Sequence, residues 1–427
     1  MNLTPEQQAV GRRNFLKALA GTPALAGLGV AAAARGPLRG GPVRIGFVGV
    51  GGQGGVLLEQ LEPAYGEVRA VCDVNPAQLA KAAATLAKTG RPPARQYAEW
   101  RDMLQKEDVE AVIVAAPLWM HAEIVTGCLD AGRHVLCEKM MAWDVAGAEQ
   151  MRDAAARNRR ILEIGYQRFY NPMYQAAYDG IVQRGVLGEV YHARLAWHRN
   201  GNWRRSGTPP SPDYDPSRWG YPTFEHLLNW RLYWRYSKGL FAELGSHQIS
   251  VANWFFGAAP EAVAASGGVQ RFRDGREVYD HVYAMVDYPQ GRTAVFSSIE
   301  SNEFDGYYEM FMGTKGTLIL KGEAEAYLFH EGKAGGPTTV EVSMKGPGPV
   351  LEASESRRAD AAGAAGGRAS VSERVDRLSP YRLEMAAFCS AVRVGTPIAC
   401  GPERALASTR ACVRANEAVA QKTRLAL

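Results

Sequence analysis

The chain has 427 residues, which is long for one globular domain and typical of two. Hydrophobic residues make up 46% of it and charged residues 22%, as in ordinary globular enzymes, and the net charge of +5 is small. No long basic run with interleaved aromatic residues occurs, which argues against a nucleic-acid partner. The six cysteines form no Cys-x-x-Cys pair, so we expect buried thiols and no metal site.

The N-terminus has the pattern of a targeting segment. Residues 11–17, Gly-Arg-Arg-Asn-Phe-Leu-Lys, resemble the twin-arginine export motif, with Gly where Ser or Thr is commoner. The mildly apolar run that follows ends in small residues at 32–34, which suit a cleavage site. We therefore expect residues 1–34 to be a signal peptide for the twin-arginine export machinery, and the protein to be periplasmic or otherwise extracytoplasmic. The alternative is an uncleaved basic amphipathic helix or anchor. A Gly- and Pro-rich linker at 35–42 follows.

Residues 43–166 alternate between apolar runs and amphipathic segments. Buried strands are expected at 43–48, 68–74, 110–116, 134–139 and 161–165, with intervening helices that include 76–88, 121–131 and 145–157. This alternation predicts a doubly wound parallel sheet of the Rossmann type, an α/β fold whose ligands bind beyond the carboxyl ends of the strands.

The first strand runs into Gly49-x-Gly51-x-x-Gly54, the spacing of a dinucleotide-binding turn. The first glycine permits the tight turn, the second lets a pyrophosphate approach the backbone, and the third allows close packing of helix on strand. The second strand ends in Asp73, 19 residues after Gly54, where a carboxylate can bind the adenosine ribose. No arginine adjoins Asp73 to take a 2′-phosphate, which favours NAD over NADP. The alternative is a glycine turn of another α/β protein, with Asp73 as a helix cap.

From residue 167 to residue 427 the pattern changes to an α+β domain with a large, mostly antiparallel open sheet. We expect a helix at 172–183, a strand at 189–199, a hairpin over 280–301, strands at 307–311, 316–320 and 326–329, and closing helices at 381–392 and 404–422. Residues 345–374, rich in Gly, Ala and Ser, are predicted to be a mobile insertion. An uncovered apolar sheet face would be a liability, which favours a homodimer or homotetramer.

Several stretches together resemble the Gfo/Idh/MocA oxidoreductase family. Besides the glycine turn, they are Ala-Pro-x-x-x-His at 116–121, Ala-Gly-Arg-His-Val-Leu-Cys-Glu-Lys at 131–139, Gly-Leu-Phe-Ala-Glu-Leu-Gly-Ser-His at 239–247, and Gly-Thr-Lys-Gly-Thr at 313–317. The resemblance covers nearly everything after residue 43. It implies an NAD-dependent enzyme that acts on CH–OH groups of a sugar, sugar derivative or cyclitol. The expected cofactor contacts are Gly49, Val50, Gly51, Gln53, Gly54, Asp73, Ala116, Pro117, His121, Glu138, Lys139 and Gln167.

The resemblance also implies the catalytic residues Lys139, Glu243 and His247. Hydride transfer from a carbinol needs a group that takes the hydroxyl proton and a positive charge near the developing oxyanion. Lys139 would supply the charge, although Met140 stands where the family has proline. Glu243 and His247 are four residues apart, so on a helix the carboxylate could orient the imidazole as a base. The alternatives are a solvated lysine at a strand end and an ordinary surface pair on a helix.

Five of the nine tryptophans fall between residues 197 and 234, among several arginines. Flat aromatic faces with polar neighbours suit a carbohydrate, and arginine can hold a carboxylate. The same residues are also common in packed loops and subunit interfaces. The substrate candidates are Trp197, Arg199, Trp230, Arg231 and Trp234.

Two enzymatic functions remain open. The first is an exported sugar or cyclitol oxidoreductase that holds NAD tightly, because little free NAD exists outside the cytoplasm. The second is an NAD-dependent glycoside hydrolase or lyase that oxidises the sugar transiently and shows no net redox change. A non-catalytic NAD-binding sensor is a third reading, which the presence of Lys139 and His247 disfavours.

Overall fold

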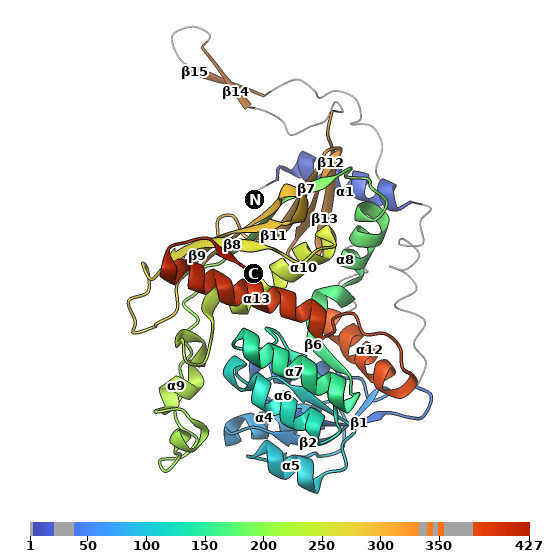
Figure 1. The fold of residues 1–427 in the computed structure, drawn as a ribbon, viewed down its shortest axis with the longest axis vertical. Helices are drawn as coiled ribbons and strands as arrows, with labels where there is room; N and C mark the ends of the chain where they lie inside the picture. Colours follow the sequence, from blue (N-terminus) through green and yellow to red (C-terminus); the bar gives the residue numbers. More distant parts are fainter. Residues whose placement is uncertain (1–2, 21–37, 333–339, 345–348, 354–378) are drawn as a thin grey trace.

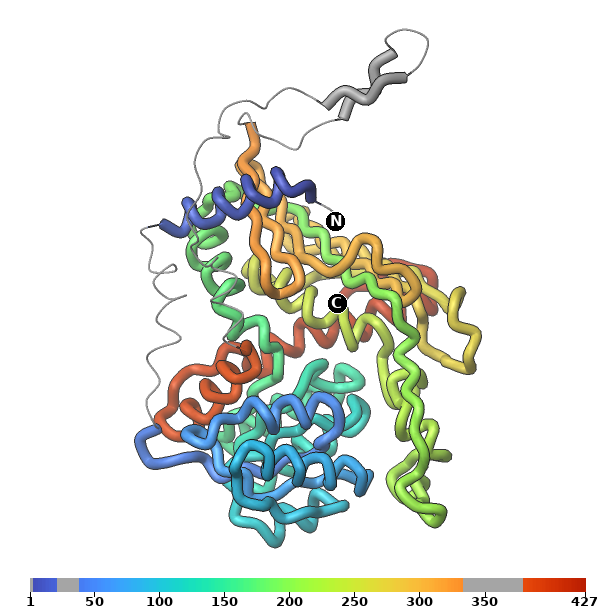
Figure 2. The backbone as a smooth tube through the Cα atoms, turned by 180° about the vertical axis from the view of Figure 1, so that it is seen from behind, coloured from blue at the N-terminus to red at the C-terminus, as the bar shows by residue number. Residues whose placement is uncertain are grey.

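The computed structural model describes residues 3–20, 38–332, 340–344, 349–353 and 379–427. Two layered units follow one another along the chain (Figures 1 and 2): a parallel sheet with helices on both faces, and a larger antiparallel sheet. Most of the expected insertion at 345–374, the second half of the expected signal peptide and part of the linker lie outside the described residues.

The first sheet has six parallel strands in the order β3-β2-β1-β4-β5-β6. Its strands are β1 Val43–Val48, β2 Gly66–Cys72, β3 Arg95–Tyr97, β4 Ala111–Val114, β5 His134–Glu138 and β6 Leu162–Gly165. The apolar runs form strands because both faces of the sheet are covered. The strand order reverses between β1 and β4, so a crevice opens at the carboxyl ends of these two strands. The predicted Rossmann sheet is confirmed.

Helices cover both faces of this sheet in two groups. One group packs on the core that contains Leu57 and Phe388, and the other on the core that contains Trp100 and Val125. The first comprises α3 Gly52–Gln60, α4 Pro76–Lys88 and α12 Pro380–Val394, and the second α5 Trp100–Lys106, α6 His121–Asp130 and α7 Val145–Asn158. The closing helix α12 thus belongs to the first unit, although it comes near the end of the chain.

The second sheet has eight strands in the order β13-β12-β11-β7-β10-β9-β8-β16. Only β7 and β10 pair in parallel, so the predicted open antiparallel sheet is confirmed. The strands are β7 Val190–His198, β8 Ala262–Gly268, β9 His281–Tyr288, β10 Arg292–Ile299, β11 Tyr307–Gly313, β12 Gly316–Lys321, β13 Glu325–His330 and β16 Leu425–Ala426. The expected hairpin is β9–β10, which turns at Pro289–Gly291. A separate hairpin pairs β14 Val340–Met344 with β15 Pro349–Ala353.

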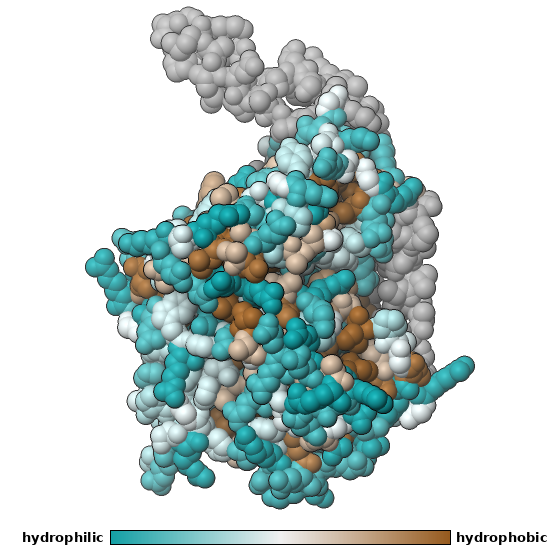
Figure 3. Space-filling view, viewed as in Figure 1, coloured by the Kyte–Doolittle hydropathy of each residue, from teal (hydrophilic) through white to brown (hydrophobic). Residues whose placement is uncertain are grey.

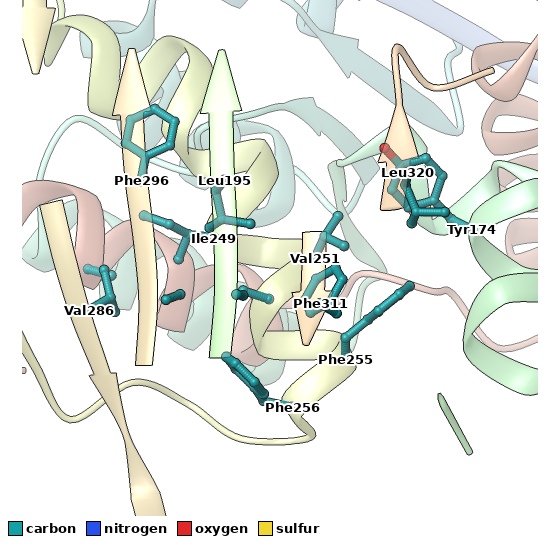
Figure 4. Packing of buried hydrophobic residues seen from close by; sticks show 14 of the residues in the cluster. Tyr174, Leu195, Ile249, Val251, Phe255, Phe256, Val286, Phe296, Phe311 and Leu320 are labelled. Atoms are coloured by element: carbon teal, nitrogen blue, oxygen red, sulfur yellow. The ribbon is translucent and has the colours of Figure 1, made fainter. Parts of the chain in front are cut away.

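One face of this sheet carries the main core of the second unit. Helix α10 Ser246–Phe256 lies on it, and Figure 4 shows its side chains Ile249, Val251, Phe255 and Phe256 beside residues of the strands. Helix α13 Pro402–Gln421 packs against both α10 and α7, so it joins the two units. The short helices α8 Pro172–Ala177 and α9 Phe224–Leu228 also belong to this half.

The N-terminal helix α1 Pro5–Leu19 packs on strand β13. A capping box formed by Thr4 and Gln7 starts it, and Phe15 and Leu19 are buried. A side chain at Gly11 would meet the rings of β13, which explains why this position is glycine. Residues 5–19 thus form a helix that packs on the second sheet, and their role as an export signal stays a prediction.

Several short elements were not expected from the sequence. Strand β3 has three exposed or partly exposed residues, β8 is built from Ala, Ser, Gly and one Val, and β16 has two residues. The strands β3 and β16 have no apolar run, and the apolar run of β8 consists of three alanines and one valine, so hydrophobic patterning gave too weak a signal to find them. The expected helix at 172–183 is interrupted, because α8 continues as a π turn at Tyr178–Val182.

Hydrophilic residues cover most of the visible surface in Figure 3, and hydrophobic residues form only small patches there. Large apolar side chains are nevertheless exposed on strands of the open sheet, namely Tyr191, Tyr283 and Met285. Among the described residues, no helix is long and apolar enough to cross a bilayer.

Candidate active site

The glycine turn between β1 and α3 has the backbone shape expected of a dinucleotide-binding site. Gly49 has a φ of +85°, and a Cβ there would lie 2.6 Å from the backbone of Ala115. A Cβ on Gly54 would collide with the carbonyl oxygen of Gly49, whereas one on Gly51 would meet open space. Gly49 therefore makes the tight turn, Gly51 leaves room for the pyrophosphate, and Gly54 allows the close packing of helix on strand, as predicted. The helix α3 begins at Gly52 and directs its free N–H groups into this space.

Asp73 follows β2 at the edge of the same space. Its carboxylate accepts hydrogen bonds from the N–H of Val50 at 2.9 Å and from that of Asn75 at 2.8 Å. Burial raises the pKa of Asp73 to about 6, although these two N–H groups favour the charged form. Each carboxylate oxygen keeps a further lone pair, so the group can still accept bonds from ribose hydroxyls.

A cavity of about 360 Å³ lies at this edge, between the two units. From the first unit it is lined by Gly49, Gly51, Gln53, Asp73, Ala116 and Pro117, and from the second by Arg205, Arg218, Tyr221, Leu228, Trp230 and Arg231. The first set belongs to the predicted cofactor residues, and the glycine cradle fits a dinucleotide. Val50 and Gly54 shape the turn from behind, through a backbone N–H and a close packing contact.

His121 lies behind the cavity wall. Its Nδ1 is 3.0 Å from the carbonyl oxygen of Met140, and its Nε2 is 2.9 Å from that of Ala116. The ring is buried, and burial lowers its pKa. His121 therefore links the end of β4 to the segment after β5, where the Lys139–Met140 peptide bond is cis. A direct cofactor contact of His121 stays a prediction.

Glu138 and Lys139 come at the end of β5. The Glu138 carboxylate accepts a bond from Gln53 Nε2 at 2.8 Å and one from the N–H of Lys139 at 3.1 Å, and burial raises its pKa. The Lys139 ammonium donates to the carbonyl oxygen of Glu243 at 2.8 Å. Burial lowers the pKa of Lys139, while Glu243 and Glu138 act against that shift. Lys139 is thus a partly buried, anchored cation rather than a solvated strand-end lysine.

The expected pairing of Glu243 with His247 is wrong. The Glu243 carboxylate binds Arg231 Nε at 2.9 Å and the Ser237 hydroxyl at 3.3 Å. Its pKa is low because the cations Arg231 and Lys139 outweigh the effect of burial. The π turn Phe241–Gly245 precedes α10 and widens the helix here, so residues four apart do not face each other as they do on an α-helix.

His247 stands among aromatic rings and cations instead. The rings of Tyr166 and Trp197 lie 5.9 Å and 5.8 Å from its own, and Trp197 stacks on Tyr307. Its Nδ1 is buried and has no hydrogen-bond partner in the part of the chain that the structure describes. Burial, together with the charges of Lys139 and Arg168, holds the pKa of His247 well below its usual range. The imidazole is therefore neutral and able to accept a proton.

Arg168 has a role in the site that the sequence analysis did not predict. This buried guanidinium binds Glu309 at 2.6 Å and Glu323 at 2.9 Å, and it lies 5.4 Å from the ring centre of Trp197. The neighbouring Gln167 donates to Glu323 at 3.3 Å, and its cofactor contact stays a prediction. Because Glu309 and Glu323 are more than 140 residues away, no local pattern could reveal this network.

The substrate candidates divide into three groups. Trp230 and Arg231 line the cavity, and Trp197 lies beside His247. Arg199 pairs with Glu300 at 2.7 Å and lies over a tryptophan ring. Trp234 packs on Tyr279, and its carbonyl accepts a bond from Trp143. Arg199 and Trp234 do not line the cavity in this structure, and their contact with a substrate stays a prediction.

Residues 199–236, which we call the strap, extend from β7 along the first unit (Figures 1 and 2). The Tyr214 hydroxyl donates to the carbonyl of Val74 at 2.9 Å, and Trp119 Nε1 donates to the Tyr221 hydroxyl at 2.8 Å. The strap thus closes the cavity from the side opposite to the glycine turn.

Comparison with known proteins places this fold and site in a family. The model of the oxidoreductase family with an NAD-binding Rossmann fold matches residues 43–166, and that of its C-terminal alpha/beta domain matches residues 180–427. The chain belongs to the Gfo/Idh/MocA oxidoreductase family.

Individual relatives are more distant. Glycosyl hydrolase family 109 protein 2 of Phocaeicola vulgatus is 34% identical over 159 residues, which are 36% of this chain and 38% of that protein. Inositol 2-dehydrogenase of Rubrobacter xylanophilus is 28% identical over 283 residues, 65% of this chain and 70% of that protein. The chain thus spans under two fifths of the length of the glycosyl hydrolase relative.

Solved structures support the fold. Apo scyllo-inositol dehydrogenase from Lactobacillus casei superposes with a TM-score of 0.64 at 19% identity, over 91% of this chain and 99% of that one. The WlbA dehydrogenase from Bordetella pertussis, solved with NADH and UDP-GlcNAcA, gives a TM-score of 0.65 at 19% identity, over 90% and 99%.

Proposed function

We propose that this chain is an NAD-dependent oxidoreductase that acts on a CH–OH group of a sugar, sugar derivative or cyclitol and holds its cofactor tightly. The observation that carries the proposal is a neutral, buried His247 under the charge of the partly buried cation Lys139. Lys139 directly follows Glu138, whose carboxylate binds the cavity residue Gln53. Asp73 at the ribose position supports NAD over NADP.

The residues divide the chemistry in a simple way. NAD, when bound, would accept the hydride from the carbinol carbon. The imidazole of His247 takes the hydroxyl proton, because its depressed pKa keeps it neutral. The Lys139 ammonium stabilises the oxyanion that develops as the O–H bond breaks. The two electrons leave the carbinol carbon with the hydride and the hydroxyl proton goes to the imidazole. The products are therefore the carbonyl compound, the reduced cofactor and an imidazolium.

The first test is to identify the nucleotide that the protein carries. The protein is purified without added nucleotide and denatured, and the released compound is identified by mass spectrometry. We expect near-stoichiometric NAD or NADH, and then NADH formation with at least one member of a sugar and cyclitol panel. Release of NADP, or a protein that binds neither nucleotide when titrated, would overturn the proposal.

A second candidate is an NAD-dependent glycoside hydrolase or lyase. The similarity to a glycosyl hydrolase family 109 protein supports it, although the match covers only 38% of that protein. An activity of this kind would release the leaving group of a chromogenic glycoside with no net change of NAD. Glycoside cleavage that requires bound NAD would favour this candidate, and net NADH formation would favour the first.

We also propose that residues 1–34 direct export through the twin-arginine pathway. The paired residues Arg12 and Arg13 before an apolar run support this proposal. Substitution of both by lysine should leave the protein in the cytoplasm of an expressing bacterium, as fractionation would reveal. Equal periplasmic amounts of both forms would contradict it.

We propose a homodimer or homotetramer as the assembly. The exposed side chains Tyr191, Tyr283 and Met285 on the open sheet support it, since a second copy would cover them. Light scattering of the purified protein tests this directly, and a monomer at micromolar concentration would contradict it.

A further inference from the structure

We propose that Arg205 binds the pyrophosphate of the cofactor from the strap, across the cavity from the glycine turn, and that it slows release of the nucleotide. The inference rests on the proposed function only in that the ligand is a dinucleotide. From the sequence, pyrophosphate binding is assigned to the glycine turn alone. Arg205 adds a residue of the second unit to that binding site.

The position of Arg205 is the first argument. One terminal nitrogen of its guanidinium lies 3.7 Å from the place that a Cβ on Gly52 would occupy. Gly52 is the first residue of the nine-residue helix α3, whose N-terminal end carries partial positive charge. A cation that faces this end is repelled by it. An anion between the two would bind both, and a pyrophosphate is the anion that a dinucleotide brings to this place.

The lack of a competing partner is the second argument. The next residue in the chain, Arg204, pairs with Glu225 and Asp274, and Arg231 pairs with Glu243. Within the described ranges, Arg205 has no such carboxylate partner, and its side chain lines the cavity. Its five N–H donors are therefore available to phosphate oxygens in the bidentate manner that arginine favours.

The fixed backbone of Arg205 is the third argument. Asn229, which is buried, accepts the Arg205 N–H at 2.6 Å and donates to the Arg205 carbonyl at 3.1 Å. This pair of bonds ties the strap to itself at the point where the guanidinium enters the cavity. The base of the side chain is thus preorganised, which lowers the entropy lost when a phosphate is bound.

The attachment of the strap explains why binding by Arg205 would affect release. Tyr214 and Tyr221 hold the strap to the first unit on the same side of the cavity. A Cβ on Gly220 would lie 2.8 Å from the ring of Trp119, so this part of the strap rests closely on the first unit. A nucleotide bound between strap and glycine turn leaves only when the bond to Arg205 breaks.

The test compares R205Q with the wild-type protein and with R235Q, a variant of an exposed strap arginine that does not line the cavity. NADH dissociation is followed by fluorescence after mixing with excess NAD. Because R205Q loses a charge-assisted hydrogen bond to the pyrophosphate, we expect NADH to leave R205Q at least about tenfold faster. R235Q should match the wild type, and R205K should lie between the two because it keeps the charge without the fork.

Binding of two cofactor fragments locates the effect. ADP-ribose contains the pyrophosphate and adenosine does not, so R205Q should weaken ADP-ribose about tenfold and leave adenosine unchanged in calorimetric titrations. An unchanged NADH dissociation rate, or equal weakening of both fragments, would overturn the inference while the proposed function stands. If the wild-type protein binds no dinucleotide, the proposed function and this inference fall together. Thermal melting of each variant checks that the fold is intact.

Discussion

The two ends of the site are built from different materials. The nucleotide end is built largely of backbone, namely three glycines, the N-terminus of α3 and the carboxyl ends of β1, β2 and β4, to which the side chain of Asp73 is added. The proton-transfer end consists of side chains that arrive from distant parts of the chain, with Lys139 after β5 and His247 on α10. The first is set by local conformation, and the second exists only after the two units have packed together.

This difference determines how each end controls its ligand. A backbone cradle offers N–H dipoles whose charge does not change with pH. The buried side chains instead shift one another's pKa values: Lys139 lowers that of His247, and Glu243 supports that of Lys139. Substitutions at the nucleotide end should therefore act mainly on binding, and substitutions at the proton-transfer end should act mainly on turnover and its pH profile.

The largest expected effect is on turnover when Lys139 is removed. K139A should lower kcat by about 10³-fold, because the oxyanion loses the ammonium that stabilises it and His247 loses one of the charges that keep it neutral. Affinity for NADH, measured by fluorescence titration, should change little. The control K106A removes an exposed lysine that pairs with Asp102. Wild-type turnover in K139A would refute the assignment of the reactive centre.

Alanine substitutions in the glycine turn should separate folding from binding. G54A places a methyl group against the carbonyl of Gly49 and should destabilise the protein by several kcal/mol. G51A meets open space, so it should melt like the wild type and bind NADH at least about tenfold more weakly, because the methyl group occupies the approach of the pyrophosphate. Thermal melting and fluorescence titration measure the two effects. Equal melting temperatures for both variants would contradict this division.

Asp73 should make binding at the nucleotide end depend on pH. Its pKa of about 6 means that the carboxyl becomes protonated as the pH falls through 6, and it then accepts hydrogen bonds less well. The Kd for NAD should therefore rise by up to about tenfold between pH 7 and pH 5. D73N cannot titrate and should show weak, nearly constant affinity over this range. Affinity that improves on acidification would reverse the assigned role.

The smallest effect concerns Glu243. E243Q removes a negative charge that raises the pKa of Lys139 but does not touch His247. The alkaline limb of the kcat profile should move to lower pH, whereas the acidic limb, set by His247, should stay in place. E225Q, on the strap, serves as a control because its carboxylate pairs with Arg204. A shift of the acidic limb would instead indicate that Glu243 interacts directly with His247, as the sequence spacing suggested.

The sequence therefore predicts the nucleotide end well. Strand, glycine turn and acid lie within 31 consecutive residues, 43–73, and each acts through its own local conformation. Apolar periodicity likewise predicts the long strands and helices, but it misses β3 and β16, which are short and lack apolar runs.

At the proton-transfer end, the sequence predicts which residues take part but not which residues they contact. Lys139 and His247 are recognisable from their motifs, but their partners are not. The π turn before α10 diverts Glu243 to Arg231. One of the charges that act on His247 comes from Arg168, whose carboxylate partners lie more than 140 residues further on. Spacing in the sequence cannot show contacts that depend on how two units pack.

The docking of α1 has a consequence for the maturation of the chain. Strand β13 is an edge strand, and α1 covers part of its face with Gly11 against aromatic rings and Arg12 paired with Glu325. If export is followed by cleavage near residue 34, the same cut that frees the protein removes this cover. The processed molecule would then expose Tyr327 and Phe329 to solvent. Precursor and mature protein would therefore differ in their tendency to associate as well as in their cellular location.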